Sequence, residues 1–234
     1  MTAILLFLLI LACLGTWWLL RQGVMSKPWL ETGVDTIQPG SDRMSPHLAK
    51  IGLGVFLGVV GSLFALFLSA YFIRMAYADW RPVPLPQAVW ISTGQLIVSS
   101  VLLQIAVIAA RKGDRTAIKL SLLFGAVATL GFLISQLMAF SELSSTGYAL
   151  TKNPANSFFF MITGAHGLHI LGGLIALGLL IADAWNDGPF ERLILKSELC
   201  ATYWHFLLLI WVVILIVLIG WADSFIAFCG QFLP

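Results

Sequence analysis

The chain has 234 residues, of which 59% are hydrophobic and 10% are charged, and its formal net charge is +2. A typical soluble domain carries about 25% charged and 45–50% apolar residues, so this composition excludes an ordinary soluble domain and a disordered chain. The small net charge gives no support for binding to nucleic acid. We therefore expect a polytopic membrane protein with no nucleic-acid partner.

Six apolar segments are long enough to cross a membrane, since a helix of about 20 residues spans about 30 Å of hydrocarbon. They cover residues 2–20, 51–76, 88–110, 118–141, 156–182 and 200–226. Helices are expected because a strand exposed to lipid leaves backbone groups unpaired, and the apolar residues do not alternate as in a barrel. The predicted fold class is all-α, a polytopic membrane helix bundle with six transmembrane helices.

The first apolar segment, residues 2–20, has two interpretations. A signal peptide normally carries positive charge before its apolar run, but Met1, Thr2 and Ala3 carry none. We therefore interpret this segment as a spanning helix. The stretch that follows it, up to residue 50, is too polar and too rich in Pro and Gly to span.

Lys and Arg are distributed unevenly between the two sides of the predicted bundle. The loops after the first, third and fifth helices hold ten of these residues, and the other side holds three. The first set is Arg21, Lys27, Arg43, Lys50, Arg111, Lys112, Arg115, Lys119, Arg192 and Lys196, and the second is Arg74, Arg81 and Lys152. Because positive loops stay in the cytoplasm, both termini are placed on the outer side of a bacterial inner membrane.

Ionisable side chains within the spans are few, and each is a candidate site because such groups are costly in lipid. His166 and His169 share one helix face, which suits either a metal or haem ligand pair or a packing pair. Small residues near them favour close helix packing, and they are Gly164, Gly167, Gly172 and Gly173. The predicted helix ends place His205 about 12 residues, or ~18 Å, from the depth of His166. A haem or metal held jointly by the two helices is therefore not expected.

Other metal, redox and proton-transfer roles find little support. Cys13, Cys200 and Cys229 lie in apolar runs at no metal-like spacing, and no Cys or Met clusters with the histidines. The central part of each predicted span lacks Asp and Glu, which argues against an autonomous proton pump. The deepest polar groups are Gln95, Gln104 and Gln136. We expect no catalytic, cofactor-binding or metal-ligating residue in this chain.

Two segments carry a more specific signal. Residues 157–173 read SFFFMITGAHGLHILGG, and residues 198–206 read ELCATYWHF with Trp211 beyond them. Together they resemble the last two helices of subunit III of the haem–copper terminal oxidases, the cytochrome c oxidase subunit 3 family. Weaker similarity in two earlier segments extends the resemblance to residues 47–228.

The resemblance implies both an architecture and a role. Residues 1–46 are expected to form an extra amino-terminal transmembrane helix and a cytoplasmic loop, and residues 47–234 to form the family's five-helix bundle. Subunits of this family carry no redox cofactor, pack with subunits I and II, hold phospholipids in a cleft and support sustained turnover. Haems and copper are expected in the partner subunits, which reduce dioxygen to water and pump protons. The extra helix is expected to contact a neighbouring respiratory complex.

The resemblance also assigns individual residues. Those that match its motifs are expected to pack, contact lipid or form hydrogen bonds, and they are His166, His169, Glu198, Tyr203, Trp204 and His205. Three positions at which the family carries a carboxylate are apolar here, namely Val60, Ala139 and Leu208. Any carboxylate function of the family is therefore not carried over to those positions, whereas Glu198 matches.

A subunit of a cytochrome c oxidase is the leading interpretation, and four alternatives remain at the level of the sequence. The first is a subunit III of a quinol oxidase, because the choice of electron donor depends on other subunits. The second is a subunit III-like protein of a nitric oxide reductase. A small membrane transporter is more remote, since no inverted repeat or broken helix is apparent, and so is an independent haem enzyme, since the chain has too few suitably placed histidines.

Overall fold

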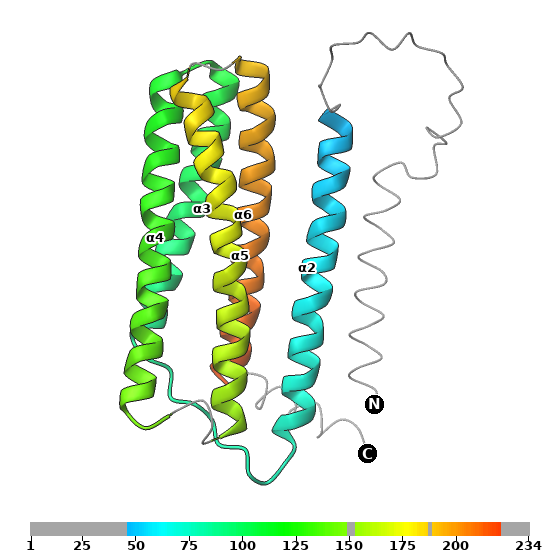
Figure 1. The fold of residues 1–234 in the computed structure, drawn as a ribbon, viewed down its shortest axis with the longest axis vertical. Coiled ribbons are helices and arrows are strands. Elements are labelled where there is room, and N and C mark those ends of the chain that lie inside the picture. Colours follow the sequence, from blue (N-terminus) through cyan, green and yellow to red (C-terminus); the bar gives the residue numbers. More distant parts are fainter. Residues whose placement is uncertain (1–45, 149–152, 187–188, 221–234) are drawn as a thin grey trace, which may run out of the picture. The chain divides into compact units, whose positions relative to one another are not determined.

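The computed structural model describes residues 46–148, 153–186 and 189–220, which form five long helices (Figure 1). Each helix is long and apolar enough to cross a membrane. Their bounds are α2 Pro46–Met75, α3 Ala88–Lys112, α4 Arg115–Ser145, α5 Pro154–Trp185 and α6 Phe190–Leu218. The all-α fold class and the last five predicted spans are confirmed. The predicted helix at residues 2–20 lies outside the described residues, and the domain division at residue 46 stays a prediction.

Local sequence signals explain how the helices begin and end. Gly113 follows α3 with φ of 75° and donates its N–H to carbonyls of the last turn, a left-handed conformation that glycine adopts without strain. Asp114 then caps α4 by accepting a hydrogen bond from Ala117 N. Because only two residues connect α3 to α4, the two helices must run antiparallel as neighbours. Asn153 caps α5 in the same way, with Pro154 in the first turn.

The last helix begins earlier than the sequence suggests. Residue 200 is the predicted start of the last span, whereas α6 begins at Phe190. Charged residues in the first three turns lower the local hydropathy and conceal the helix, and they are Glu191, Arg192, Lys196 and Glu198. His205 therefore lies near the middle of α6 and not near its inner end.

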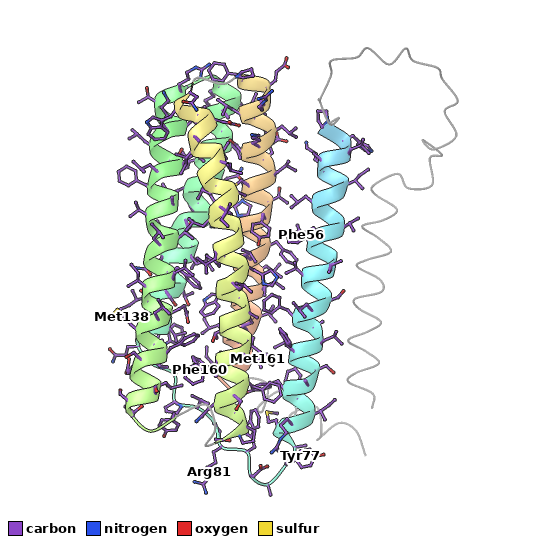
Figure 2. All side chains as sticks on the ribbon, in the orientation of Figure 1. Phe56, Tyr77, Arg81, Met138, Phe160 and Met161 are labelled. Carbon is purple, nitrogen blue, oxygen red and sulfur yellow. The ribbon has the colours of Figure 1, made fainter. Side chains whose placement is uncertain are left out.

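Helices α3 to α6 surround one core, and α2 lies against α5 and α6 (Figure 1). The largest fully buried side chains of the core include Trp204, Trp211 and Phe132. Of the five helices, α2 is the least buried and α6 the most buried. Among the labelled side chains, Met138 of α4 points away from the bundle and Phe56 lies between α2 and the other helices (Figure 2). The bundle is thus four tightly packed helices with α2 on one side.

Polar side chains join α3 to α4 inside the apolar core. Three hydrogen bonds join side chains of the two helices, from Ser135 Oγ to Gln95 Oε1 at 2.9 Å, from Gln136 Nε2 to Ser92 Oγ at 2.8 Å, and between Ser99 Oγ and Thr129 Oγ1 at 2.7 Å. A fourth runs from Ser99 Oγ to the Gly125 carbonyl at 3.1 Å. The two buried indoles of α6 also find acceptors there, on Thr129 and Thr93. Within a membrane such bonds hold helices together, since water is not available as a partner.

The loop between α2 and α3, residues 76–87, is held by polar contacts at two places. Arg74 donates two hydrogen bonds to the Asp79 carboxylate, at 2.8 and 2.5 Å, and this guanidinium holds the pKa of Asp79 below its ordinary value. The side chain of Asn153 donates to the Arg81 carbonyl at 2.7 Å. The segment between α2 and α3 is thereby tied to the start of α5.

One glycine sets the distance between α5 and α6. A Cβ atom at Gly173 would lie 2.5 Å from Tyr203 Cε1 and 2.9 Å from Trp204 Cη2. At Gly164 and Gly172 a Cβ atom would meet nothing within 4 Å. The prediction of close packing is confirmed for Gly173 and is wrong for Gly164 and Gly172, because a Cβ atom at either position has open space. At Gly167 a Cβ atom would make only an ordinary contact with the Leu133 side chain, at 3.9 Å.

We expect Gly173→Ala to destabilise the protein by roughly 1–3 kcal/mol, since the added methyl overpacks the contact with two aromatic rings. Gly172→Ala is the matched control and should be neutral, because its Cβ has open space. Thermal unfolding of the full-length protein in detergent measures both. Equal melting temperatures for the two variants would show that the α5–α6 spacing adjusts without cost.

Candidate functional site

Glu198 ties three helices together at one end of the bundle. It lies on α6, and its carboxylate accepts from Lys50 Nζ of α2 and from Arg111 Nη2 of α3, each at 2.8 Å. The glutamate side chain is 20% exposed, whereas both bases are more than half exposed. The sequence singles out Glu198 and places both bases in cytoplasmic loops, but it does not pair them. The three charges form a rim at the end of the bundle where α6 begins, the end that the sequence predicts to face the cytoplasm.

His166 is enclosed by aromatic rings. It is fully buried on α5, and its ring centroid lies 6.1 Å from Phe64, 5.7 Å from Phe132 and 5.1 Å from Trp211. Neither ring nitrogen has a hydrogen-bond partner among the described residues. An unpaired buried polar group costs free energy. His166 therefore resembles a packing residue in its contacts, although its polar atoms remain unpaired there.

His169 has a different environment although it lies one turn away. Its Nδ1–H donates to the Ala165 carbonyl at 2.7 Å, and its ring lies 5.4 Å from that of Phe64. The backbone carbonyl of His169 accepts a hydrogen bond from the Tyr203 hydroxyl at 2.8 Å. The side chain of His169 also borders a cavity. The two histidines of the motif share a helix face and both border the Phe64 ring, but they have no hydrogen-bond partner in common among the described residues.

His205 lies on the face of α6 that points away from the bundle core, and its side chain is exposed. Its ring is hydrogen-bonded to Ser100 Oγ at 2.5 Å and to Gln104 Oε1 at 3.1 Å, both on α3. His166 faces Trp211, and His205 precedes Trp211 by six residues, so the two histidines differ in depth by ~9 Å. The predicted separation of about 12 residues is wrong, because α6 starts earlier than expected.

The structure does not bring the predicted histidines together as ligands. Among the described residues, no three side chains of His, Cys, Asp or Glu are close enough to hold a metal ion. Cys200 is buried with a free thiol, and the other two cysteines lie outside the described residues. Three of the motif residues line one cavity, and they are His169, Tyr203 and Trp204.

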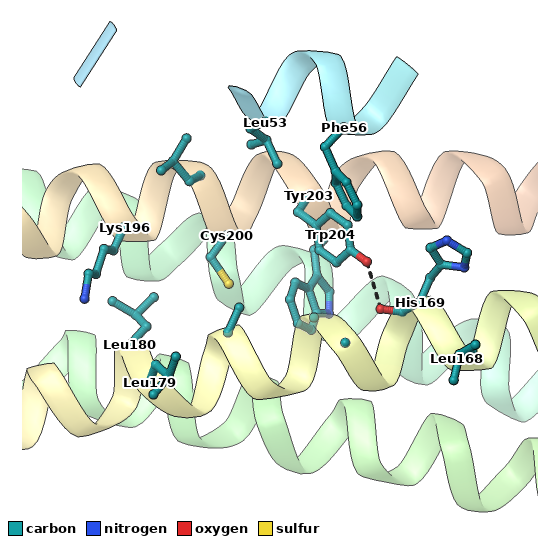
Figure 3. A pocket seen from close by; sticks show the side chains of 14 residues that line it. Leu53, Phe56, Leu168, His169, Leu179, Leu180, Lys196, Cys200, Tyr203 and Trp204 are labelled. Carbon is teal, nitrogen blue, oxygen red and sulfur yellow. Dashed lines mark hydrogen bonds between the residues drawn. The ribbon is translucent and has the colours of Figure 1, made fainter. Parts of the chain in front are cut away.

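The cavity between α2, α5 and α6 has a volume of about 550 Å³ and a mostly apolar lining (Figure 3). Leu53 and Phe56 of α2 form one wall, and Gly172 and Gly173 of α5 leave space on the other. Lys196 lies at one end, where it is paired with Asp183 of α5. We call this space the α2–α5–α6 cavity. The sequence reveals its glycines and aromatic residues, but not that α2 stands far enough away to leave it open.

The three positions that lack a family carboxylate lie within apolar packing. Val60 is 3% exposed and Ala139 is fully buried. Leu208 is partly buried against the core. Val60 belongs to the narrow apolar stripe by which α2 contacts α5 and α6, together with Phe64 and neighbours one turn apart. Side chains without charge are therefore consistent with their surroundings at all three positions.

We expect His166→Leu to leave stability unchanged or to raise it by roughly 1–3 kcal/mol, because the substitution removes unpaired polar atoms at similar volume. Tyr203→Phe is the comparison and should lower stability slightly, since it deletes a formed hydrogen bond. Thermal unfolding in detergent measures both variants. A large loss in His166→Leu would mean that the imidazole binds a group from outside the described residues.

Comparison with known proteins identifies the family. The cytochrome c oxidase subunit III family matches residues 49–223 of the chain. A probable cytochrome c oxidase subunit 3 of Mycobacterium tuberculosis (strain ATCC 25618 / H37Rv) is 31% identical over 179 residues, which cover 74% of this chain and 88% of that protein. Cytochrome c oxidase subunit 3 of Synechocystis is 30% identical over 179 residues, with 73% and 75% coverage.

A third relative is named for a different type of oxidase. The cytochrome bo(3) ubiquinol oxidase subunit 3 of Pseudomonas aeruginosa is 28% identical over 128 residues, which cover 53% of this chain and 59% of that protein. The match over most of the chain, together with the five-helix bundle that carries the motif residues, gives one conclusion. The chain belongs to the cytochrome c oxidase subunit III family, the accessory subunits of haem–copper oxidases.

Proposed function

We propose that this chain is the non-catalytic subunit that packs with subunits I and II of a haem–copper oxidase and holds phospholipid in the α2–α5–α6 cavity. The cavity carries the lipid part of the proposal. Its volume of about 550 Å³ lies within the range of roughly 300–1,000 Å³ that is usual for ligand sites. Its lining is apolar along most of its length, which suits an acyl chain.

The polar end of the cavity suits a lipid headgroup. Lys196 borders the cavity at the end where α6 begins, and its side chain is 42% exposed. Its ammonium group is paired with Asp183 but has further N–H donors for a phosphate, and the other oxygen of the Asp183 carboxylate can accept from a headgroup amine. The ion-pair cluster of Glu198 with Lys50 and Arg111 lies at the same end of the bundle. A phospholipid with its headgroup at this rim and a tail in the cavity matches both ends.

The chemistry of the complex belongs to its other subunits in this proposal. Haems and copper are bound by the partners, which reduce dioxygen and pump protons, and this chain supplies packing surface and lipid. The complex resides in a bacterial inner membrane, with both termini of the chain on the outer side, as the Lys and Arg distribution indicates. The amino-terminal helix contacts a neighbouring respiratory complex.

A quinol-oxidising partner is the second candidate. The relative from Pseudomonas aeruginosa is named as a subunit of a ubiquinol oxidase. Its alignment covers 53% of this chain, against 73–74% for the relatives named for cytochrome c oxidase. The longer matches favour a partner that oxidises cytochrome c.

Purification of the tagged chain from its native membrane in mild detergent tests the association. We expect a catalytic subunit to co-purify, with haem bands in a reduced-minus-oxidised spectrum and with dioxygen uptake. The donor that supports this uptake, cytochrome c or quinol, identifies the oxidase type. A chain that purifies alone, or that shows a Soret band by itself, would contradict the proposal.

Filling the cavity tests the lipid. Gly172→Phe directs a ring toward the α2–α5–α6 cavity from a position whose Cβ atom would have no neighbour within 4 Å, and it should lower the phospholipid retained per complex. Gly178→Phe is the matched control, because Gly178 has the same open space on α5 but does not line the cavity. Mass spectrometry of lipid extracted from the purified complex counts the bound molecules. Equal lipid in both variants would show that the cavity is not the binding site.

A further inference from the structure

The outer surface between α3 and α6 carries polar side chains at a depth where lipid is expected. We call it the α3–α6 polar face and define it by Ser100 and Gln104 of α3 and by Thr202 and His205 of α6. Gln104, Thr202 and His205 are exposed. The Thr202 hydroxyl donates to the Glu198 carbonyl within its own helix, so Gln104 and His205 are the groups that remain to be explained.

The hydrogen bonds of this face leave one group without a partner. The carboxamide oxygen of Gln104 can only accept, so His205 Nε2 carries the proton and donates to it at 3.1 Å. The Ser100 hydroxyl then donates to His205 Nδ1. The amide nitrogen of Gln104 keeps two N–H donors, and it makes no hydrogen bond within the part of the chain that the structure describes.

The depth of these groups follows from the charged rim. Glu198 lies level with Lys50 and Arg111 at the inner end of the bundle. His205 follows Glu198 by seven residues, which places it ~10 Å further along the helix. Lys and Arg can extend to the interface from such a depth, but a histidine or glutamine side chain is too short. The free amide of Gln104 is therefore held inside the hydrocarbon region, where an unpaired polar group is costly.

The exposed face of α4 has no such groups at comparable depths. Between Leu120 and Met138, every exposed side chain of α4 is apolar, namely Leu120, Leu123, Phe124, Val127, Leu130, Ile134, Leu137 and Met138. That surface suits lipid tails. Apolar side chains also flank Gln104 one turn away on each side, since Val101 and Ile108 are 53% and 45% exposed. The α3–α6 polar face thus combines a surface for helix packing with one unpaired donor.

We propose that the α3–α6 polar face docks against a transmembrane helix of another subunit of the oxidase complex, which presents a hydrogen-bond acceptor to the amide nitrogen of Gln104. A protein helix fits better than lipid tails, because lipid tails offer no acceptor at this depth. The inference rests on the proposed function only in that it takes an oxidase subunit as the partner. It adds which side of the bundle faces that subunit and which side chain recognises it.

Photo-crosslinking in native membranes tests the docking face. Benzoylphenylalanine replaces Val101 on the polar face or Val127 on α4, two exposed residues at similar depth because Ser99 is hydrogen-bonded to Thr129. We expect position 101 to capture another oxidase subunit and position 127 to capture none. Capture from position 127 alone would overturn the docking face. So would adducts at position 101 with lipid, a second copy or residues 1–45.

Co-purification distinguishes a failure of the docking face from a failure of the proposed function. If oxidase subunits co-purify with the chain but are captured only from position 127, the docking face is wrong and the proposed function stands. If no oxidase subunit co-purifies, the proposed function fails first.

A substitution pair tests the recognition by Gln104. Gln104→Leu removes the outward amide and should reduce the chain retained in the complex after detergent extraction by about threefold, the usual effect of one interhelical hydrogen bond in a membrane. Ser100→Ala is the matched control, since it breaks only the inner bond to His205 and leaves the outward amide in place. Equal losses in the two variants would assign the effect to internal packing and overturn the recognition role.

Discussion

The contact between α5 and α6 at Gly173 determines the arrangement of most of the motif residues. Because Gly173 has no side chain, the rings of Tyr203 and Trp204 lie directly against the α5 backbone. This contact fixes the depth of one helix against the other. In the same register, Trp211 lies beside His166, and the Tyr203 hydroxyl reaches the backbone carbonyl of His169. A shift of either helix would break all of these contacts together.

The cavity is a consequence of how α2 is attached. A narrow apolar stripe around Val60 and Phe64 holds α2 against α5 and α6, and Lys50 ties its first turn to Glu198. Between these two attachments Gly172, whose Cβ position is open, borders a volume that the side chains of α2 do not fill. This volume, with Lys196 at its polar end, is the proposed phospholipid site.

Polar side chains inside the bundle fall into two groups. Most of those between α3 and α4, and the indoles of Trp204 and Trp211, have hydrogen-bond partners within the chain, although the Gln136 carboxamide oxygen has none among the described residues. The ring nitrogens of His166 have none among the described residues, and on the outer surface the amide nitrogen of Gln104 makes no hydrogen bond there either, although its carboxamide oxygen is bonded to His205. The first is enclosed by rings, so its cost is internal to the fold. The Gln104 amide faces outward, so a hydrogen-bond acceptor on a neighbouring subunit can offset the free-energy cost of leaving it unpaired. In this proposal the amide gains its partner only when the chain is part of a complex.

The sequence by itself determined the all-α class, the last five spans and the family, because apolar length and short motifs are local properties. It also selected Glu198, His169 and Tyr203. Only the tertiary structure decided which partners they have, since Lys50 and Glu198 are far apart in the chain and meet through helix packing. Because the first turns of α6 are charged, the sequence predicted its start ten residues too late, and the depth predicted for His205 was wrong. Of the glycines on α5, only the packed structure shows that Gly173 is the tight one, because closeness depends on the facing helix.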